Sequence, residues 1–257
     1  MAIYVMTGAT TGIGAAAREK LQEQGHEVFN IDYKGGDYTA DLSTPEGRKG
    51  AIAEVHRRFP DGIDAMICNA GVGPTAPIPV IFALNFFASV QLAEGVRDLL
   101  KMRKGCCVIT SSNSITNMTV RMDWVDMLAN VMDEERAMEF AKDLPRELAP
   151  SAYSSSKRAL AKWVRRVSPS WAADGLRINA VAPGNTTTPM TQSMTAAQMD
   201  AALLIPIPTR YGRREFLDAV EIANGICFLA SKEASGINGI ILFVDGGIDA
   251  LLRSEQI

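Results

Sequence analysis

The alternation of two kinds of segment restricts the fold of this chain more than any other feature of its sequence. Short runs rich in β-branched and aromatic residues indicate strands near residues 3–7, 27–31, 38–41, 63–68, 105–111, 176–181 and 239–244. Longer runs with helical periodicity lie between them, near residues 12–24, 45–59, 80–101, 151–172 and 216–231. This order is typical of βαβ units, whose parallel strands are covered by helices on both faces. The sequence therefore predicts an α/β fold with a doubly wound parallel sheet of about seven strands.

Two segments interrupt this alternation. Residues 113–150 separate a strand from the next helix and have helical periodicity of their own, which predicts a helical insertion. Residues 185–215 are the second segment, and we expect them to form a lid over a binding site. The two segments hold eight of the twelve methionines, and methionine serves both as a gap filler in cores and as an adaptable binding surface. Because no repeat, low-complexity tract or linker occurs, residues 1–257 are expected to form a single domain.

Charge and hydropathy limit the partners of the chain. The net charge of -3 is spread without basic blocks, so neither nucleic acid nor an anionic membrane is an expected partner. The longest apolar run, residues 78–87, is interrupted by Pro79 and Asn85 and is predicted to be too short to span a bilayer. The N-terminus enters a strand at Ile3 without a basic leader, so we expect no signal peptide and a cytoplasmic location.

The cysteines and histidines do not indicate a metal site or a disulfide framework. Three of the four cysteines lie in apolar strand-like runs, where a free thiol behaves as a small hydrophobe. The four are Cys68, Cys106, Cys107 and Cys227. The two histidines, His26 and His56, lie near no cysteine or carboxylate cluster and are expected on the solvated surface. Zinc and His-dependent triads are therefore not expected.

A glycine-rich turn with Gly8, Gly12 and Gly14 follows the first predicted strand and precedes the first predicted helix. This order lets the backbone approach a pyrophosphate and points the N–H groups of the first helical turn at that anion. A purely structural strand-to-helix turn also favours glycine. The position straight after a strand favours dinucleotide binding, and the expected sheet is then of the Rossmann type.

The second predicted strand ends at Asp32, about twenty residues beyond the glycines. An acid at this place bonds both hydroxyls of an adenosine ribose and repels a 2′-phosphate. Thr10 and Thr11 are neutral and Lys34 is the only basic residue nearby, so NAD(H) is favoured over NADP(H). An aspartate that caps the following turn is the alternative.

Tyr153 and Lys157 are four residues apart at the start of a predicted helix, so their side chains share one face. A phenol is a poor base at neutral pH, but a neighbouring ammonium favours its phenolate. Tyr153 is therefore a candidate general acid and base. This spacing also occurs by chance on many amphipathic helices.

Several further motifs occur along the chain. Together with the residues above they form Thr7-Gly8-x-x-x-Gly12-Ile13-Gly14, Asn69-Ala70-Gly71, Ser111-Ser112, Tyr153-x-x-x-Lys157, Pro183-Gly184 and Asp245-Gly246-Gly247. In their order and rough spacing the chain resembles the short-chain dehydrogenase/reductase family over nearly its whole length. The residues at 41–44 and 245–250, the short segment 69–85 and the long insertion make it similar to the bacterial 3α-hydroxysteroid dehydrogenase/carbonyl reductases within that family.

The resemblance implies four catalytic residues. They are Tyr153 as general acid and base, Lys157 as the group that lowers its pKa and holds the nicotinamide ribose, Ser112 as the donor to the substrate oxygen, and Asn85 as the holder of a relay water. Ser111 and Ser114 are alternatives to Ser112, which is preferred because the family serine is the second of the Ser-Ser pair.

The resemblance also implies the residues that bind NAD. Gly8, Thr10, Gly12, Ile13 and Gly14 would lie at the pyrophosphate side, Asp32 at the ribose, Asp41 and Leu42 at the adenine, Asn69, Ala70 and Gly71 along the cofactor edge, and Tyr153, Lys157, Pro183, Gly184, Thr186 and Thr188 toward the nicotinamide. Thr188 is preferred to Thr186 for the carboxamide. Small residues at 69–71 also suit the close packing of a strand terminus.

The implied function is an NAD(H)-dependent interconversion of a secondary alcohol and a ketone, with the 3α-hydroxyl or 3-keto group of steroids as the expected substrate. The methionine-rich segments and residues 205–207 favour a large apolar substrate. A short-chain dehydrogenase for a non-steroid carbonyl is one alternative. A nucleotide-sensing protein on the same fold is another, although the set of Tyr153, Lys157 and Ser112 argues against it.

The insertion is expected to change the subunit interface of the expected homodimer. Its apolar residues are too numerous for a solvated loop. They are Trp124, Val125, Leu128, Val131, Met132, Met138 and Phe140. Family members commonly use the helix that begins near residue 151 for subunit contact, so the resemblance implies that the insertion covers or replaces part of that interface. Its first residues, 116–122, are expected to border the substrate mouth.

Overall fold

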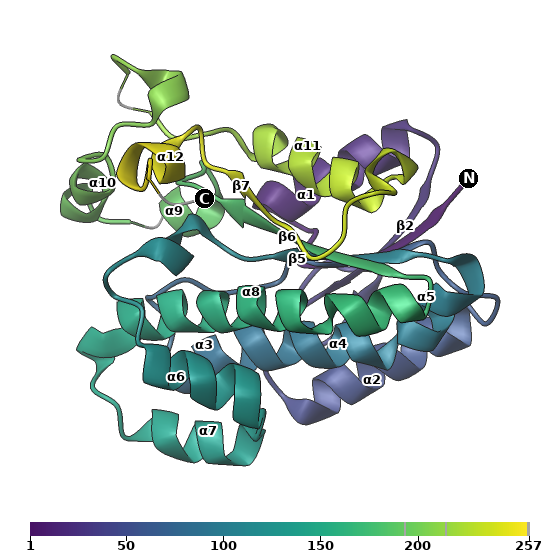
Figure 1. Cartoon of the computed structure of the whole chain (residues 1–257). Coiled ribbons are helices and arrows are strands. Elements are labelled where there is room, and N and C mark those ends of the chain that lie inside the picture. Colours follow the sequence, from purple (N-terminus) through teal and green to yellow (C-terminus); the bar gives the residue numbers. More distant parts are fainter. Residues whose placement is uncertain (193, 214, 256–257) are drawn as a thin grey trace.

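The computed structural model describes residues 1–192, 194–213 and 215–255 and contains one parallel sheet (Figure 1). Its strands are β1 (Ile3–Thr7), β2 (Glu27–Asp32), β3 (Tyr38–Thr39), β4 (Ala65–Cys68), β5 (Cys106–Thr110), β6 (Arg177–Pro183) and β7 (Ile241–Val244). They lie in the order β3-β2-β1-β4-β5-β6-β7, with every pairing parallel. This confirms the predicted α/β sheet. The strand order reverses between β1 and β4, where open α/β sheets bind ligands beyond the carboxyl ends of their strands.

Helices cover both faces of the sheet (Figure 1). One face carries α1 (Gly12–Glu23) and α11 (Ala219–Ala230), followed by a short turn at Lys232–Ala234. The other carries α2 (Pro45–Arg58), α3 (Ile78–Phe82), α4 (Ser89–Gly95), α5 (Arg97–Arg103) and α8 (Ala149–Ala173). Each face has its own hydrophobic cluster, and the strands contribute alternate side chains to the two.

The prediction of one continuous helix over residues 80–101 was wrong in its details. A π-helical turn, Ala83–Ala88, joins α3 to α4, and Val96 adopts φ -115° between α4 and α5. The helix predicted over 216–231 begins only at Ala219, because Asp218 forms the N-cap and its N–H donates to the Glu221 carboxylate at 2.8 Å. The strand predicted over 38–41 ends at Thr39.

The apolar run after residue 78 is longer than the sequence indicated. Because the helical conformation continues through Asn85, Ile78–Gly95 spans 18 residues, and it is the one helical stretch in the described part of the chain that is long and apolar enough to cross a membrane. Two-thirds of it is buried, and it packs on α8 within the core. This places it as a core helix of the fold.

The insertion is helical and packs on its own chain. It contains a 3-10 turn (Asn113–Thr116), α6 (Met122–Asp126), a π turn (Met127–Val131), α7 (Glu134–Lys142) and a second 3-10 turn (Arg146–Leu148). In Figure 1, α6 and α7 lie outside α8 and α3, which they contact. Trp124, Val125 and Leu128 are buried there. Trp124 makes edge-to-face contacts with Phe82 of α3 and Phe140 of α7.

The second irregular segment, residues 185–215, gathers beyond the carboxyl ends of the strands (Figure 1). It contains α9 (Pro189–Gln192), α10 (Ala196–Ala202) and a 3-10 turn (Pro208–Arg210), and it lies near α12 (Ile248–Leu252). Leu204 and Tyr211 are exposed. The segment is therefore less deeply packed than the insertion.

The cysteines are free thiols and all four are buried. The histidines are less solvated than expected. His26 is half-buried against Tyr4, and His56 is half-buried with its Nε2 at 2.9 Å from the Gly95 carbonyl. Contacts between segments that are distant in sequence, which the sequence does not show, account for the difference.

Candidate active site

The end of β5 and the first turns of α8 bring Ser112, Tyr153 and Lys157 together. The Ser112 side chain lies close enough to the Tyr153 hydroxyl to lower the pKa of the phenol. Ser112 Oγ also accepts the N–H of Ser114 at 3.1 Å, which fixes the hydroxyl at the start of the 3-10 turn. Tyr153 is half-buried and Ser112 is 8% exposed. A phenol and a serine hydroxyl thus converge where one substrate oxygen could meet both.

Lys157 lies behind this pair and is almost fully buried. Its Nζ donates to the Thr110 carbonyl at 2.8 Å, so the ammonium is anchored to the end of β5. Burial lowers the pKa of Lys157 to about 8. The proximity expected from the Tyr-x-x-x-Lys spacing is therefore accompanied by a bond that the sequence did not indicate.

The pKa of Tyr153 differs from the sequence expectation. Burial raises the pKa of Tyr153, and the interaction with the Ser112 side chain opposes that rise.

The two alternative serines have other environments. Ser111 is buried and its hydroxyl donates to the Lys157 carbonyl at 3.0 Å, which ties β5 to α8. Ser114 Oγ is buried without a hydrogen-bond partner among the residues that the structure describes. Of the three serines, Ser112 is the one whose hydroxyl meets Tyr153.

Asn85 is fully buried in the π turn before α4. Its side-chain amide makes two hydrogen bonds with the backbone of Val72, accepting at 2.9 Å and donating at 3.0 Å. A β-carbon added at Gly71 would lie 2.9 Å from Asn85 Oδ1 and 3.4 Å from Lys157 Nζ. Asn85 therefore lies beside the catalytic group and holds the loop after β4.

The glycine turn forms a close cradle. Gly8 has φ +68°, and a β-carbon there would lie 2.7 Å from the Ala70 Cα. A β-carbon at Gly14 would lie 2.1 Å from the Gly8 carbonyl oxygen. Only glycine fits both places, so the turn brings bare backbone and the start of α1 to the sheet edge. Ile13 follows as the second residue of α1. These residues suit a dinucleotide pyrophosphate.

Asp32 lies at the end of β2 beside this turn. Its carboxylate accepts the N–H of Thr10 at 3.1 Å and that of Tyr33 at 2.8 Å. The second bond is the local turn contact that the sequence left open. Sequence reasoning missed Asn30, a buried residue whose Oδ1 accepts the Ala9 N–H at 3.0 Å and so holds the turn from below.

The segment Asn69-Ala70-Gly71 is fixed by two threonines that sequence reasoning missed. Thr7 Oγ1 accepts the N–H groups of Asn69 and Ala70 at 3.1 and 3.0 Å. Thr110 Oγ1 donates to Asn69 Oδ1 at 3.1 Å, while Asn69 Nδ2 donates to the Gly8 carbonyl at 2.9 Å. A polar residue at the last position of a buried strand is the sequence signal that could have identified both.

Asp41 and Leu42, the residues predicted to contact the adenine, follow β3. Asp41 is exposed and its carboxylate accepts the N–H and hydroxyl of Ser43. Leu42 is buried. Asp41 and Leu42 therefore lie in the turn between β3 and α2.

The residues after β6 close the other side of the edge. Pro183 ends β6, and a β-carbon at Gly184 would lie 2.7 Å from the Asp245 Cα. Thr186 is buried and its hydroxyl donates to the Gly184 carbonyl, whereas Thr188 is half-buried and lies against Gly12. Thr188 is therefore the threonine that faces the glycine turn.

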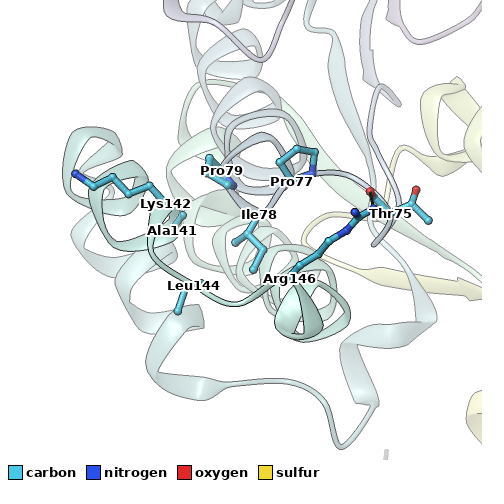
Figure 2. A pocket seen from close by; sticks show the side chains of 8 residues that line it. All are labelled: Thr75, Pro77, Ile78, Pro79, Ala141, Lys142, Leu144 and Arg146. Carbon is cyan, nitrogen blue, oxygen red and sulfur yellow. Dashed lines mark hydrogen bonds between the residues drawn. The ribbon is translucent and has the colours of Figure 1, made fainter.

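A cavity of about 300 Å³ lies where the loop after β4 meets the insertion (Figure 2). Ile78, Ala141 and Leu144 line it, together with Thr75, Pro77, Pro79, Lys142 and Arg146. Arg146 points toward Thr75 and donates to its carbonyl at 3.4 Å. Through residues 141–146, the insertion thus borders the loop that continues from Gly71, and the border of residues 116–122 on the substrate mouth stays a prediction.

Comparison with known proteins extends this geometry. The chain is 33% identical to the 3-alpha-hydroxysteroid dehydrogenase/carbonyl reductase of Comamonas testosteroni, over 100% of both proteins. The chain belongs to the short-chain dehydrogenase/reductase family. The crystal structure of the 3-alpha-hydroxysteroid dehydrogenase of Pseudomonas sp. B-0831 complexed with NADH superposes with a TM-score of 0.92 at 35% identity, covering 99% of this chain and 100% of that one.

Two further similarities agree with the family assignment. Residues 145–249 match the family model described as enoyl-(acyl carrier protein) reductase. The coniferyl-alcohol dehydrogenase of Pseudomonas sp. (strain HR199 / DSM 7063) is 29% identical over 95% of both chains. The short-chain dehydrogenase/reductase fold and an oxidoreductase activity with a nicotinamide dinucleotide are therefore established for this chain at the level of the family.

Proposed function

We propose that this protein uses NAD(H) to interconvert a secondary alcohol and a ketone, with 3α-hydroxysteroids and 3-ketosteroids as its substrate class. One observation carries the proposal: the side chains of Tyr153 and Ser112 interact at the end of β5, and the buried Lys157 ammonium lies beside Gly71, next to the glycine cradle. The full-length similarity to two 3-alpha-hydroxysteroid dehydrogenases supports the substrate class.

The chemistry follows from the side chains. When bound, the nicotinamide ring supplies the hydride acceptor or donor. In the oxidative direction Tyr153 Oη accepts the alcohol proton, while Ser112 holds the same oxygen. In the reductive direction the two hydroxyls donate to the carbonyl oxygen and stabilise the negative charge that develops there. In this proposal the Lys157 ammonium would hold the cofactor ribose, and Asn85 would hold a relay water.

Asp32 supports NAD(H) over NADP(H). Its carboxylate ends β2 beside the glycine turn, where a 2′-phosphate would meet a negative charge. The Asp32 carboxylate also accepts the Thr10 N–H at 3.1 Å, which ties the end of β2 to the glycine turn. Thr188, against Gly12, is the proposed contact of the carboxamide.

Partly exposed apolar side chains of residues 185–215 support an apolar substrate. Met190 is 45% exposed, and its sulfur would lie 3.2 Å from a β-carbon at Gly73, so α9 reaches the loop after β4. We therefore propose that this segment is the substrate lid of a single domain, 1–257. A homodimer in the cytoplasm completes the proposal, with the insertion covering the outer side of α8.

A substrate panel tests the proposal. Reduced nicotinamide absorbance would be followed with 3α-, 3β- and 17β-hydroxysteroids and with coniferyl alcohol, each with NAD and with NADP. We expect the highest kcat/KM for the 3α-hydroxysteroid with NAD. Faster oxidation of a non-steroid alcohol would mean that steroids are not the substrate class. Absence of turnover with every alcohol would favour a nucleotide-binding role without catalysis. Light scattering at micromolar concentration would test the dimer.

A further inference from the structure

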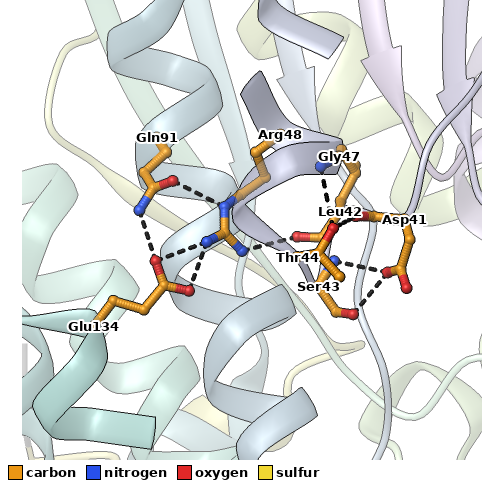
Figure 3. A network of polar contacts seen from close by, with 8 residues as sticks. All are labelled: Asp41, Leu42, Ser43, Thr44, Gly47, Arg48, Gln91 and Glu134. Atoms are coloured by element: carbon orange, nitrogen blue, oxygen red, sulfur yellow. Dashed lines mark hydrogen bonds and ion pairs between the residues drawn. The ribbon is translucent and has the colours of Figure 1, made fainter. Parts of the chain in front are cut away.

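A fully buried arginine joins the insertion to the adenine-side turn (Figure 3). Arg48 of α2 is 1% exposed. Its Nη2 donates to both carboxylate oxygens of Glu134, at 2.5 and 2.7 Å, and its Nε donates to Gln91 Oε1 at 2.8 Å. The remaining nitrogen, Nη1, donates to the Leu42 carbonyl at 3.1 Å. All three nitrogens of the guanidinium are therefore used.

The network connects three segments that are distant in sequence. Glu134 is the first residue of α7 in the insertion, and Gln91 belongs to α4 and donates to the same carboxylate at 3.0 Å. Leu42 lies in the turn before α2, where Thr44 caps the helix by accepting the Gly47 N–H at 3.1 Å. A movement of α7 would therefore displace the guanidinium that holds the Leu42 carbonyl.

The charge of Glu134 is needed for this arrangement. A guanidinium cannot lose its proton inside a protein, so a buried arginine requires a compensating negative charge. Glu134 is the carboxylate paired with Arg48. Without that charge, the arginine would turn toward solvent and release Leu42.

We propose that Glu134 is a positioning residue for the adenosine half of the cofactor, acting through Arg48 on the turn at residues 41–44. The insertion then sets cofactor affinity as well as filling the core. The inference rests on the proposed function, because it assumes that the turn after β3 borders the adenine of NAD.

Ligand fragments separate this role from general destabilisation. Glu134→Gln removes the charge and keeps the size, and Arg48→Met removes the bond to Leu42. We expect each variant to bind ADP-ribose and NADH roughly threefold to thirtyfold more weakly, which is the range for changes along a coupled network. Reduction of a ketone by reduced nicotinamide mononucleotide, which lacks the adenosine, should keep its kcat/KM.

The matched control is Asp126→Asn, which breaks another contact of the insertion, the 2.6 Å pair with Lys162 of α8. It should leave the affinity for ADP-ribose unchanged. The double variant of Arg48 and Glu134 should bind ADP-ribose no more weakly than Arg48→Met, because both residues act on one path. Amide hydrogen exchange at residues 41–47 in the ligand-free protein should accelerate in Glu134→Gln and not in Asp126→Asn.

The outcomes separate this inference from the proposed function. Wild-type protein that fails to bind ADP-ribose would overturn both. Wild-type binding together with unchanged affinity in Glu134→Gln and Arg48→Met would overturn the positioning role alone. An equal loss of kcat/KM with reduced nicotinamide mononucleotide would also overturn it, since the variants would then disturb the whole site.

Discussion

The insertion and the segment 185–215 are similar in sequence but different in structure. Both are long, irregular and rich in methionine. In the insertion, Trp124, Val125 and Leu128 are at most 4% exposed and pack in the core. In the second segment, Leu204 is 80% and Tyr211 84% exposed. The insertion is thus part of the folded core, whereas the second segment offers apolar surface beside the site.

The methionines do not follow this difference, because packed and exposed methionine side chains occur in both segments. Four of the eight pack against the hydrophobic clusters, namely Met127, Met138, Met194 and Met199. The other four are exposed, namely Met118, Met122, Met132 and Met190. Composition could not separate packing from recognition, because a flexible thioether suits both. The comparison teaches that the role of such a segment depends on what surface it finds.

The largest expected effect is on stability, in the insertion. Trp124→Ala should destabilise the protein by about 3–5 kcal/mol, because it removes a fully packed indole and leaves a cavity beside Phe82 and Phe140. Chemical denaturation measures the free energy of unfolding. Leu204→Ala is the control from the other segment, expected within about 0.5 kcal/mol of wild type. Similar losses in both variants would remove the distinction between the regions.

Next in size is the effect on catalysis of Tyr153 in α8, the helix that follows the insertion and precedes the second segment in the chain. Tyr153→Phe should lower kcat by about a hundredfold or more, because it removes the oxygen that transfers the proton and keeps the ring. The affinity for NADH and the free energy of unfolding should stay close to wild type. Stopped-flow kinetics measure the loss of turnover, and titration with NADH measures the cofactor affinity. Activity within about tenfold of wild type would exclude Tyr153 as the general acid and base.

A smaller effect comes from Lys157 on α8, the helix that the insertion covers. Burial lowers its pKa to about 8 from 10.5. Between these values the unfolded chain binds the proton and the folded chain does not, so stability should rise as pH increases through this window. Burial of the charged Lys157 lowers the free energy of unfolding, and this unfavourable contribution is fully present below about pH 8. In Lys157→Met the free energy of unfolding should not rise in this way between about pH 8 and 10.5, and chemical denaturation at several pH values would measure it. If the free energy of unfolding changed with pH in the same way in wild type and Lys157→Met, the lowered pKa of Lys157 would be contradicted.

The smallest expected effect lies in the exposed segment. Met190→Ala should raise the KM of an apolar ketone roughly threefold to tenfold, because it removes one flexible apolar contact. Stability should change by less than about 0.5 kcal/mol, since the side chain is 45% exposed. Steady-state kinetics with a steroid and with a small ketone would check it. A loss confined to the small ketone would place the lid elsewhere.

Asp32→Ala extends the comparison to the cofactor side, beyond both segments. Removing the ribose acceptor and the repulsive charge should reduce the preference for NAD over NADP. Steady-state constants for both cofactors measure the preference ratio. An unchanged ratio would mean that another residue selects the cofactor.

The sequence alone determined the sheet, the glycine turn and the residues that meet at the site. Strand periodicity and the order of the motifs predict β1 through β7, because a parallel sheet needs apolar strands and helical crossovers, both of which are local patterns. Tyr153 and Lys157 share a helix face by their spacing alone, and Ser112 follows a strand whose carboxyl end lies on the same edge.

Tertiary structure decided which partners these residues have. Lys157 donates a hydrogen bond to the Thr110 carbonyl. Arg48 is buried between Leu42 and Glu134, and Glu134 lies 86 residues from Arg48 in the sequence. The same holds for the insertion: Trp124, Val125 and Leu128 are buried where it packs on α3 and α8. Val131, Met132 and Phe140 remain exposed, contrary to the expectation that all its apolar residues are covered. Local patterns specify the elements, because neighbours along the chain set backbone preference. The burial of a charge depends on groups brought together only when the chain has folded.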